Sequence, residues 1–171
     1  MGLVAVALIL ASASAAAEEL RIGFVNIPKL MDQSPQKEAA GAMLEKRFAP
    51  RDAELADQRE AIRKLEEQLE RDGAVMAASK RADLEKEIRE RTRDFKRSSD
   101  DYKEDVNIAR NEELAKLQRE VLEAIVEISR QENYDLVLAD SVIFASNRVD
   151  FTDQVLEYLR KQFEASGNKS R

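Results

Sequence analysis

A seven-residue repeat of large apolar side chains constrains the fold of this chain more than any other feature of its sequence. A spacing of seven places such side chains along one side of an α-helix, where a second helix can cover them. The repeat consists of Phe48, Leu55, Ile62, Leu69 and Met76, with Leu44 and Leu65 at intermediate positions. The sequence therefore predicts a long helix that packs against another.

A second apolar stripe follows at helical spacing. Its members are Leu84, Ile88, Phe95, Tyr102, Val106, Leu114, Leu117, Val121, Ile125 and Ile128. Gly73 lies between the two stripes, and glycine commonly ends helices. Ser79 is predicted to cap the return helix. We expect a helical hairpin over residues 34–133 with its tip at about 72–79, the alternative being one continuous helix that contains Gly73.

Two prolines mark the outgoing helix. Ser34-Pro35 is typical of a helix start, with Ser34 as N-cap and Pro35 at the first helical position. Pro50 falls inside the heptad stripe, where proline removes a backbone donor. We expect Pro50 to kink the helix or to mark a joint between two helices.

The composition favours an extended helical protein over a compact globule, because 36% of the residues are charged and only 5% are aromatic. The net charge of −6 argues against nucleic acid as a partner. The chain has no cysteine and no histidine, and it offers no nucleophile–base pair, phosphate loop or metal cluster. These observations predict a protein that is not an enzyme and that needs no cofactor. Four hairpin carboxylates, Glu66, Glu67, Glu85 and Glu87, are interpreted as solvated helix faces.

The N-terminus is typical of a secretory signal peptide. The apolar run Leu3–Ala11 is too short to span a bilayer, and Ala15-x-Ala17 fits a signal-peptidase site. We expect residues 1–17 to be removed by cleavage after Ala17. No Lys or Arg precedes the apolar run, which a misassigned start codon would explain. The alternatives are an uncleaved membrane anchor and an ordinary buried segment.

The flanks of the hairpin, residues 18–33 and 134–171, are predicted to form a small β-body. Expected strands are Leu20–Asn26, Tyr134–Asp140 with both faces covered, and a third made by Val142–Ala145 and Val149–Phe151. Expected helices are a short one, Ile27–Met31, and a final one that Thr152-Asp153 caps and that ends in a frayed polar tail from Ser166. The apolar face of the final helix consists of Val155, Leu156, Leu159 and Phe163.

Three short strands and one short helix are too small for an independent core, and their unpaired edges need partners. Self-association supplies them most economically. The residues expected to form the shared body are Ile22, Phe24, Leu136, Val137, Leu138 and Phe144.

Several segments resemble the Skp (OmpH-like) family of periplasmic chaperones. They are Ile22-Gly23-Phe24-Val25-Asn26, Leu84-Glu85-Lys86-Glu87, Arg110-Asn111-Glu112-Glu113, the segment Tyr134–Asp140 and Asp150-Phe151-Thr152. The resemblance covers essentially the whole chain after the signal peptide. The order of strand, long hairpin, strand, strand and helix carries it more than any single motif.

The resemblance implies an α+β fold, with a long antiparallel coiled-coil hairpin on a small β-strand body that assembles into a trimeric barrel. It also implies a periplasmic homotrimer whose three hairpins hold unfolded outer-membrane β-barrel proteins in a central cavity, without ATP. The acidic balance departs from the strongly basic members of the family, so contact with anionic lipid or lipopolysaccharide stays open. The alternative function is a structural coiled-coil adaptor or scaffold of the cell envelope.

Three pairs of apolar residues are candidates for client contact. Val75 and Met76 lie at the predicted tip, where closing the seam between the helices is the favoured interpretation. Met43 and Leu44 lie near the root of the hairpin, where packing against the body is favoured. Leu122 and Val126 lie off the main stripe and face either the body or the cavity.

Overall fold

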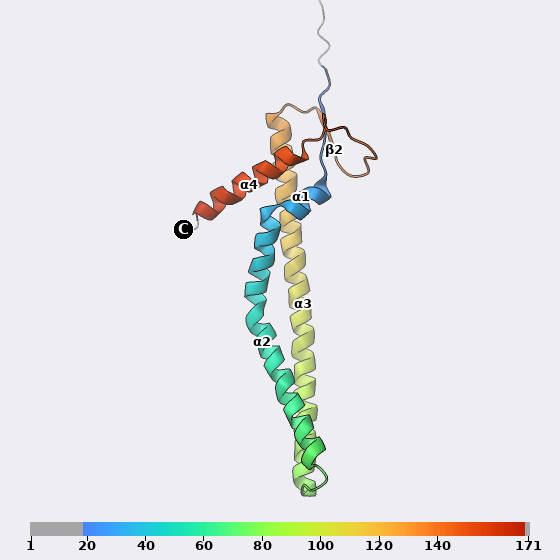
Figure 1. The fold of residues 1–171 in the computed structure, drawn as a ribbon, viewed down its shortest axis with the longest axis vertical. Helices are drawn as coiled ribbons and strands as arrows, with labels where there is room; N and C mark the ends of the chain where they lie inside the picture. Colours follow the sequence, from blue (N-terminus) through green and yellow to red (C-terminus); the bar gives the residue numbers. More distant parts are fainter. Residues whose placement is uncertain (1–18, 170–171) are drawn as a thin grey trace, which may run out of the picture.

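Two long antiparallel helices dominate the computed structural model (Figure 1), which describes residues 19–169. In chain order the elements are β1 (Ile22–Phe24), α1 (Ile27–Gln33), α2 (Pro35–Asp72), α3 (Ala78–Gln131), β2 (Leu136–Leu138) and α4 (Thr152–Lys169). The hairpin of α2 and α3 confirms two helices over a continuous one. The predicted signal peptide, residues 1–17, lies outside the described residues.

The seam between α2 and α3 is narrow. Phe48, Leu55 and Ile62 are buried on α2, so each heptad there contributes one large side chain. On the other side, Leu84 and Ala109 are buried in the arm of α3. The ring of Phe48 meets that of Tyr102 edge-on at a centroid distance of 5.9 Å. One large side chain per heptad buries little apolar surface, so packing holds the arm less firmly than a full core would.

One member of the predicted return stripe does not join the seam. Leu114 was expected to be covered, but its side chain is 54% exposed. The facing turn of α2 carries Ala40 and Gly41, which line the same groove as Leu114. Residues this small do not extend far enough from the helix to cover a leucine.

Helix α2 runs through Pro50 without a break, so the predicted joint between two helices is wrong. The helix nevertheless bends along its length (Figure 1). Proline has no backbone N–H, so the carbonyl of Lys46 lacks its usual partner four residues on. A proline at such a site is a recognised cause of helix bending.

We expect Pro50→Ala to straighten and stabilise α2, because alanine restores the missing hydrogen bond and removes the ring. Proline in a helix interior is about 3 kcal/mol less favourable than alanine, so a gain of ~1–3 kcal/mol is expected after relaxation of the bend. Slower amide hydrogen exchange along α2 would report the gain. Unchanged or faster exchange would show that the bend is held by other contacts.

Position 73, at the end of α2, needs glycine because no Cβ fits there, and not because its backbone is left-handed. Its φ is −57°, and its N–H donates to the carbonyl of Leu69 at 2.8 Å. A Cβ at this position would lie 2.3 Å from the Leu69 oxygen, too close for any other residue. Helix α3 begins at Ala78 with Ala77 as N-cap and no side-chain cap, so the predicted cap by Ser79 is wrong. Ser34 does occupy the N-cap position of α2, although its side chain makes no capping hydrogen bond.

The sheet of the body is smaller than the sequence predicted. Strands β1 and β2 are parallel, with Ile22 opposite Leu136 and Phe24 opposite Leu138. Both strands are shorter than expected. The prediction that both faces of the second strand are covered is wrong within one chain, because Leu136 and Leu138 are 45% and 43% exposed.

The predicted third strand is absent from the described part of the chain. Only an isolated bridge between Phe24 and Asp150 represents it. Ser141 has a positive φ of 66°, which turns the chain as it leaves β2. Ile143 and Phe144 then project into solvent, at 103% and 83% exposure. Residues 142–145 pair with neither strand of this sheet within one chain.

The core lies where α1 and α4 pack on the root of α3. Its buried members are Val25, Leu30, Leu117, Val121, Ala124, Ile125, Ile128, Phe151, Val155, Leu156 and Leu159. The stacked rings of Tyr134 and Phe151, 4.6 Å apart, lie beside Gly23. A Cβ on Gly23 would come within 2.7 Å of the Phe151 ring, so glycine is required there.

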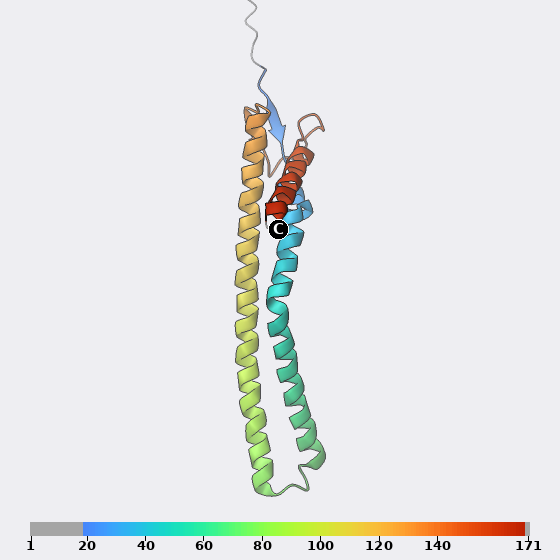
Figure 2. The same cartoon turned by 90° about the vertical axis from the view of Figure 1, so that its left-hand side faces the viewer.

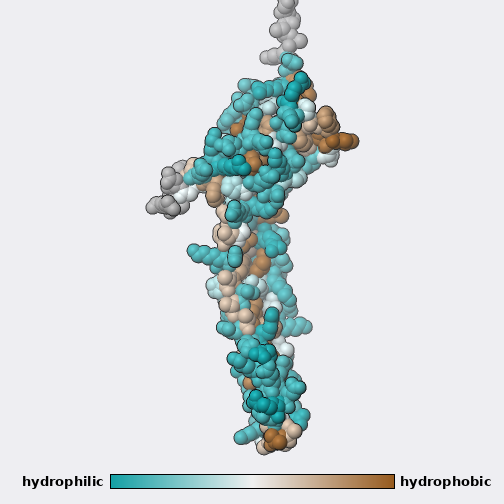
Figure 3. Space-filling model, viewed as in Figure 1, coloured by the Kyte–Doolittle hydropathy of each residue, from teal (hydrophilic) through white to brown (hydrophobic). Residues whose placement is uncertain are grey.

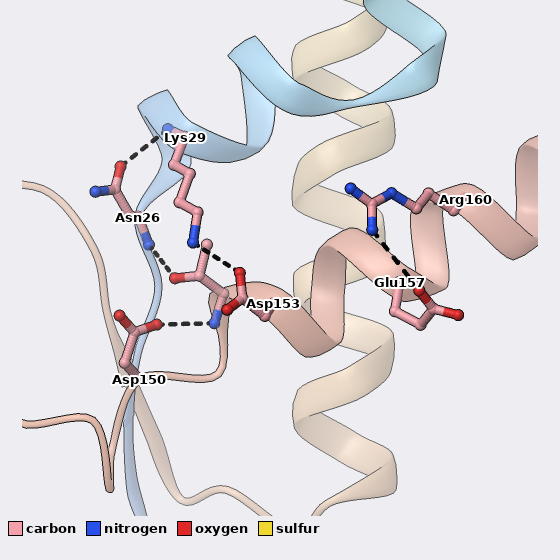
Figure 4. A network of polar contacts seen from close by, with 7 residues as sticks. Asn26, Lys29, Asp150, Asp153, Glu157 and Arg160 are labelled. Carbon is pink, nitrogen blue, oxygen red and sulfur yellow. Dashed lines mark hydrogen bonds and ion pairs between the residues drawn. The ribbon is translucent and has the colours of Figure 1, made fainter.

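A chain of polar contacts joins the N-terminal segment to α4 (Figure 4). The N–H of Asn26 donates to Thr152 Oγ1 at 2.9 Å, and Lys29 Nζ meets Asp153 Oδ1 at 2.7 Å. Asp150 Oδ1 accepts from the N–H of Thr152, so Asp150 satisfies this donor at the start of α4 in place of the predicted cap. The predicted apolar face of α4 is correct for Val155, Leu156 and Leu159, while Phe163 is half-buried. Helix α4 continues to Lys169, past the position Ser166 at which the polar tail was expected to begin.

Candidate functional site

The candidate contact residues occupy three separate places on a largely hydrophilic surface (Figure 3). Val75 and Met76 lie at the tip, Met43 and Leu44 at the hairpin root, and Leu122 and Val126 on α3. Met43, Leu122 and Val126 are 46%, 44% and 47% exposed, whereas Leu44 and Met76 are half-buried. The fold does not bring the three pairs together.

The tip exposes one large apolar side chain. Val75 is 87% exposed, so the interpretation that it closes the seam is wrong for this residue. Met76 is half-buried, as closure of the seam requires. The neighbouring charges of Arg71 and Asp72 pair with each other at 3.0 Å. The tip therefore presents Val75 as an apolar contact point beside a neutralised pair.

A groove opens between α2 and α3 at the root of the hairpin, with a volume of about 430 Å³. We call it the root groove. Its floor is apolar and its rim carries both signs of charge, from Lys37, Glu45, Arg110 and Glu113. The floor is lined by Ala40, Gly41, Leu44, Phe48, Tyr102, Val106, Leu114 and Leu117.

The root groove exists because α2 begins with small residues. The run Ala39–Ala42 has little side-chain volume, and Ala40 and Gly41 of this run line the groove opposite α3. A Cβ built on Gly41 meets no other atom within 4 Å, so the space beside it is open. A second groove lies on the other side of Ala40 and Leu117, where Met43 and Phe163 line the space between the hairpin root and α4. Met43 thus lies beside the body but is not buried by it.

The far end of the root groove is closed by aromatic and charged side chains. Arg51 pairs with Asp105 across the two helices, and its guanidinium lies 5.9 Å from the centre of the Tyr102 ring. Arg47 lies 5.2 Å from the centre of the Phe48 ring. Cations over aromatic faces contribute about 0.5–1 kcal/mol at exposed sites. These contacts hold Phe48 and Tyr102 in place as the end wall of the groove.

Many charges along the arm pair locally. A hydrogen bond from Arg63 holds the pKa of Glu60 below its usual range, and Arg71 does the same for the pKa of Asp72. A lowered folded-state pKa stabilises the fold at neutral pH, and this contribution is lost as the pH falls through that pKa. Such exposed pairs contribute little each.

Two kinds of feature are absent from residues 19–169. This part of the chain has no group of three or more acidic, histidine or cysteine side chains that would hold a metal ion. Over the same range no helix is both long and apolar enough to cross a bilayer.

The residues predicted to form a shared body gather at the sheet. Ile22, Leu136, Leu138 and Phe144 are 38%, 45%, 43% and 83% exposed. Phe24 and Val137 are half-buried, and Val137 packs against the core. An exposed apolar sheet of this kind favours contact with a further protein surface. Its role in assembly stays a prediction.

A family model described as outer membrane protein (OmpH-like) matches residues 21–159. The chain belongs to the OmpH-like family. The match begins at β1 and ends within α4, so it includes the body and the whole hairpin. The resemblance predicted from the sequence segments is thereby confirmed.

Curated OmpH-like relatives carry the name Chaperone protein Skp. The protein of Pectobacterium atrosepticum is 29% identical over 154 residues, which cover 90% of this chain and 93% of the relative. That of Yersinia enterocolitica is 29% identical over 150 residues, covering 87% and 92%. The crystal structure of an OmpH-like protein from Caulobacter crescentus CB15 superimposes with a TM-score of 0.74 at 17% identity. It covers 84% of this chain and 85% of the other, which supports the fold.

The root groove is the feature of this OmpH-like chain that sequence reasoning missed. Leu44 was identified as a candidate, but Gly41, Tyr102 and Leu114 were not. The signal was present in the run of small residues Ala39–Ala42. Small residues opposite a stripe of leucines predict a gap in the seam.

Proposed function

We propose that this OmpH-like chain is an ATP-independent holdase that keeps unfolded outer-membrane β-barrel proteins from aggregating. The observation that carries the proposal is the apolar root groove on an otherwise hydrophilic, weakly packed arm. Such an arm offers apolar contacts and adapts its spacing to clients of different size. The name Chaperone protein Skp, borne by relatives that match about nine-tenths of the chain, supports the same function.

The working unit in this proposal is a homotrimer. The exposed apolar residues of the two-stranded sheet, together with the unpaired segment 142–145, need partners that one chain does not supply. Strands from three copies would complete a small barrel, from which three hairpins project around a cavity. Light scattering at micromolar concentration is expected to give three times the mass of the mature chain. A monomer mass would contradict the trimer.

The location in this proposal is the periplasm. Residues 1–17 supply the export signal, with cleavage after Ala17. Mass spectrometry of protein exported by a Gram-negative host is expected to give a chain that begins at Glu18. A chain that retains the apolar run would argue instead for an anchor.

The holdase function predicts that the protein suppresses aggregation of an unfolded client. A urea-unfolded eight-stranded outer-membrane barrel, diluted into buffer, is expected to stay soluble at about one trimer per client. Light scattering with and without ATP measures the effect, and both conditions should agree. Equal aggregation in the presence and absence of the protein would overturn the proposal. An envelope adaptor, by contrast, would copurify with one folded partner and leave client aggregation unchanged.

A further inference from the structure

We propose that the root groove is the subsite that receives unfolded segments in which apolar and polar residues alternate. This inference rests on the holdase function proposed above and names the chemistry of the client segment. It assigns a recognition role to Gly41, Tyr102 and Leu114.

The groove is concave, and its apolar floor is reachable from solvent. Leu114 is 54% exposed although it lies between two helices, and the space beside Gly41 is empty. Phe48 and Tyr102 form a wall that is fixed by their edge-on contact. A preformed apolar concavity binds an apolar side chain without first paying for its own ordering.

The charged rim of the root groove favours a polypeptide segment over a wholly apolar occupant. Lys37 and Arg110 supply positive charge, and Glu45 and Glu113 supply negative charge. Charges of both signs around an apolar floor suit an occupant that is apolar on one side and polar on the other. An extended chain with alternating residues has this property, because successive side chains point to opposite sides. Transmembrane β-strands carry this alternation in their sequences.

The length of the groove fits a short extended segment. On α2 its floor runs from Ala40 to Phe48, about 12 Å at 1.5 Å per residue. On α3 it runs from Tyr102 to Leu117, about 22 Å. An extended segment advances about 3.3 Å per residue, so the groove takes roughly four to seven residues. About two to four side chains on one side of such a segment then reach the floor.

Gly41→Leu tests the groove by filling it. The new side chain enters open space, and leucine is a better helix former than glycine, so the urea midpoint of unfolding is expected to rise. The Kd for a labelled, urea-unfolded outer-membrane barrel is expected to increase about tenfold, the loss of one buried client side chain. Stability would therefore rise while client affinity falls, a combination that a purely structural role of Gly41 would not produce. Ala42→Leu is the matched control, because Ala42 is exposed and lines neither groove.

Leu114→Ser tests the floor without filling it. This change is expected to raise the client Kd about fivefold, because half of a leucine side chain is lost from the contact. Ile108→Ser is the matched control: Ile108 is 50% exposed on the same helix but does not line the groove. Its Kd should stay within about twofold of the unaltered chain.

Two synthetic twelve-residue peptides of equal composition test the alternation. One alternates apolar and polar residues, and the other has its apolar residues in one block. The alternating peptide is expected to displace the labelled client at lower concentration, and Gly41→Leu should abolish the difference. Equal competition by the two peptides would overturn the claim of alternation.

The outcomes separate this inference from the function on which it rests. If the unaltered protein does not bind the client, the holdase function fails. If it binds and both groove variants bind equally well, only the groove inference fails. A change of assembly mass on Gly41→Leu would mean that a second copy occupies the groove, which also overturns the inference.

Discussion

Replacing Leu136 by aspartate is expected to dissociate the assembly while each chain still folds. Leu136 is 45% exposed on β2 within one chain, so a charge there stays in water and leaves the core intact. In a barrel shared between copies the same side chain would be buried, and an unpaired buried charge costs several kcal/mol. The association constant should fall on the order of a hundredfold or more. Light scattering against concentration measures the loss, and circular dichroism reports whether the helices remain.

Ile108→Asp is the control for this prediction. Ile108 is as exposed as Leu136, at 50%, but lies on the α3 arm away from the sheet. The same change of charge there should leave the mass unaltered. If Leu136→Asp keeps the mass of the unaltered protein, the sheet is not the assembly surface.

The hairpin was predictable because its signal is local and repeated. Phe48, Leu55 and Ile62 recur at the helical period, and the structure buries all three. Gly73 was placed correctly at the end of α2, but for a reason that the sequence does not contain. Its missing Cβ avoids the Leu69 oxygen, a contact that exists only once the turn has formed.

The wrong predictions for the strands of the β-body have a different physical origin. The segment 142–145 has the residue types of a strand, yet a strand depends on an edge with which to pair. Within one chain the segment pairs with neither strand of the sheet, and it stays irregular with Ile143 and Phe144 exposed. The prediction that both faces of β2 are covered is wrong within one chain for a similar reason. These predictions concerned an assembly, whereas the structure describes one chain.

The root groove was missed because periodicity reports which residues face a seam and not how well the seam is filled. Leu114 has the expected phase on α3, but Ala40 and Gly41 leave it uncovered. The same stripe thus contributes packing at Leu117, which is 5% exposed, and open surface one turn away. Figure 2 shows the two arms from the side, with α1 and α4 beside the root of the hairpin.

Replacing Leu159 by alanine is expected to destabilise the chain strongly. Leu159 is fully buried on α4 within the core that joins α4 to α1 and α3. Removing such a side chain leaves a cavity and typically costs about 2–5 kcal/mol. Its carbonyl also accepts a hydrogen bond from Gln36 at the start of α2, at 2.9 Å, so movement of α4 disturbs the root of the arm. Urea unfolding followed by circular dichroism, at fixed protein concentration, measures the loss.

Leu69→Ala provides the contrast, because Leu69 is half-buried near the tip and belongs to the narrow seam. We expect a loss of about 1 kcal/mol that is confined to the end of the arm, with faster hydrogen exchange around Gly73 and an unchanged assembly mass. If the two truncations were equally costly, the seam would be as well packed as the core. The unequal result follows from where the buried residues lie. Helix α3 is fixed at its root by the core and only lightly held beyond it, so we expect the far end of the arm to move more than its root.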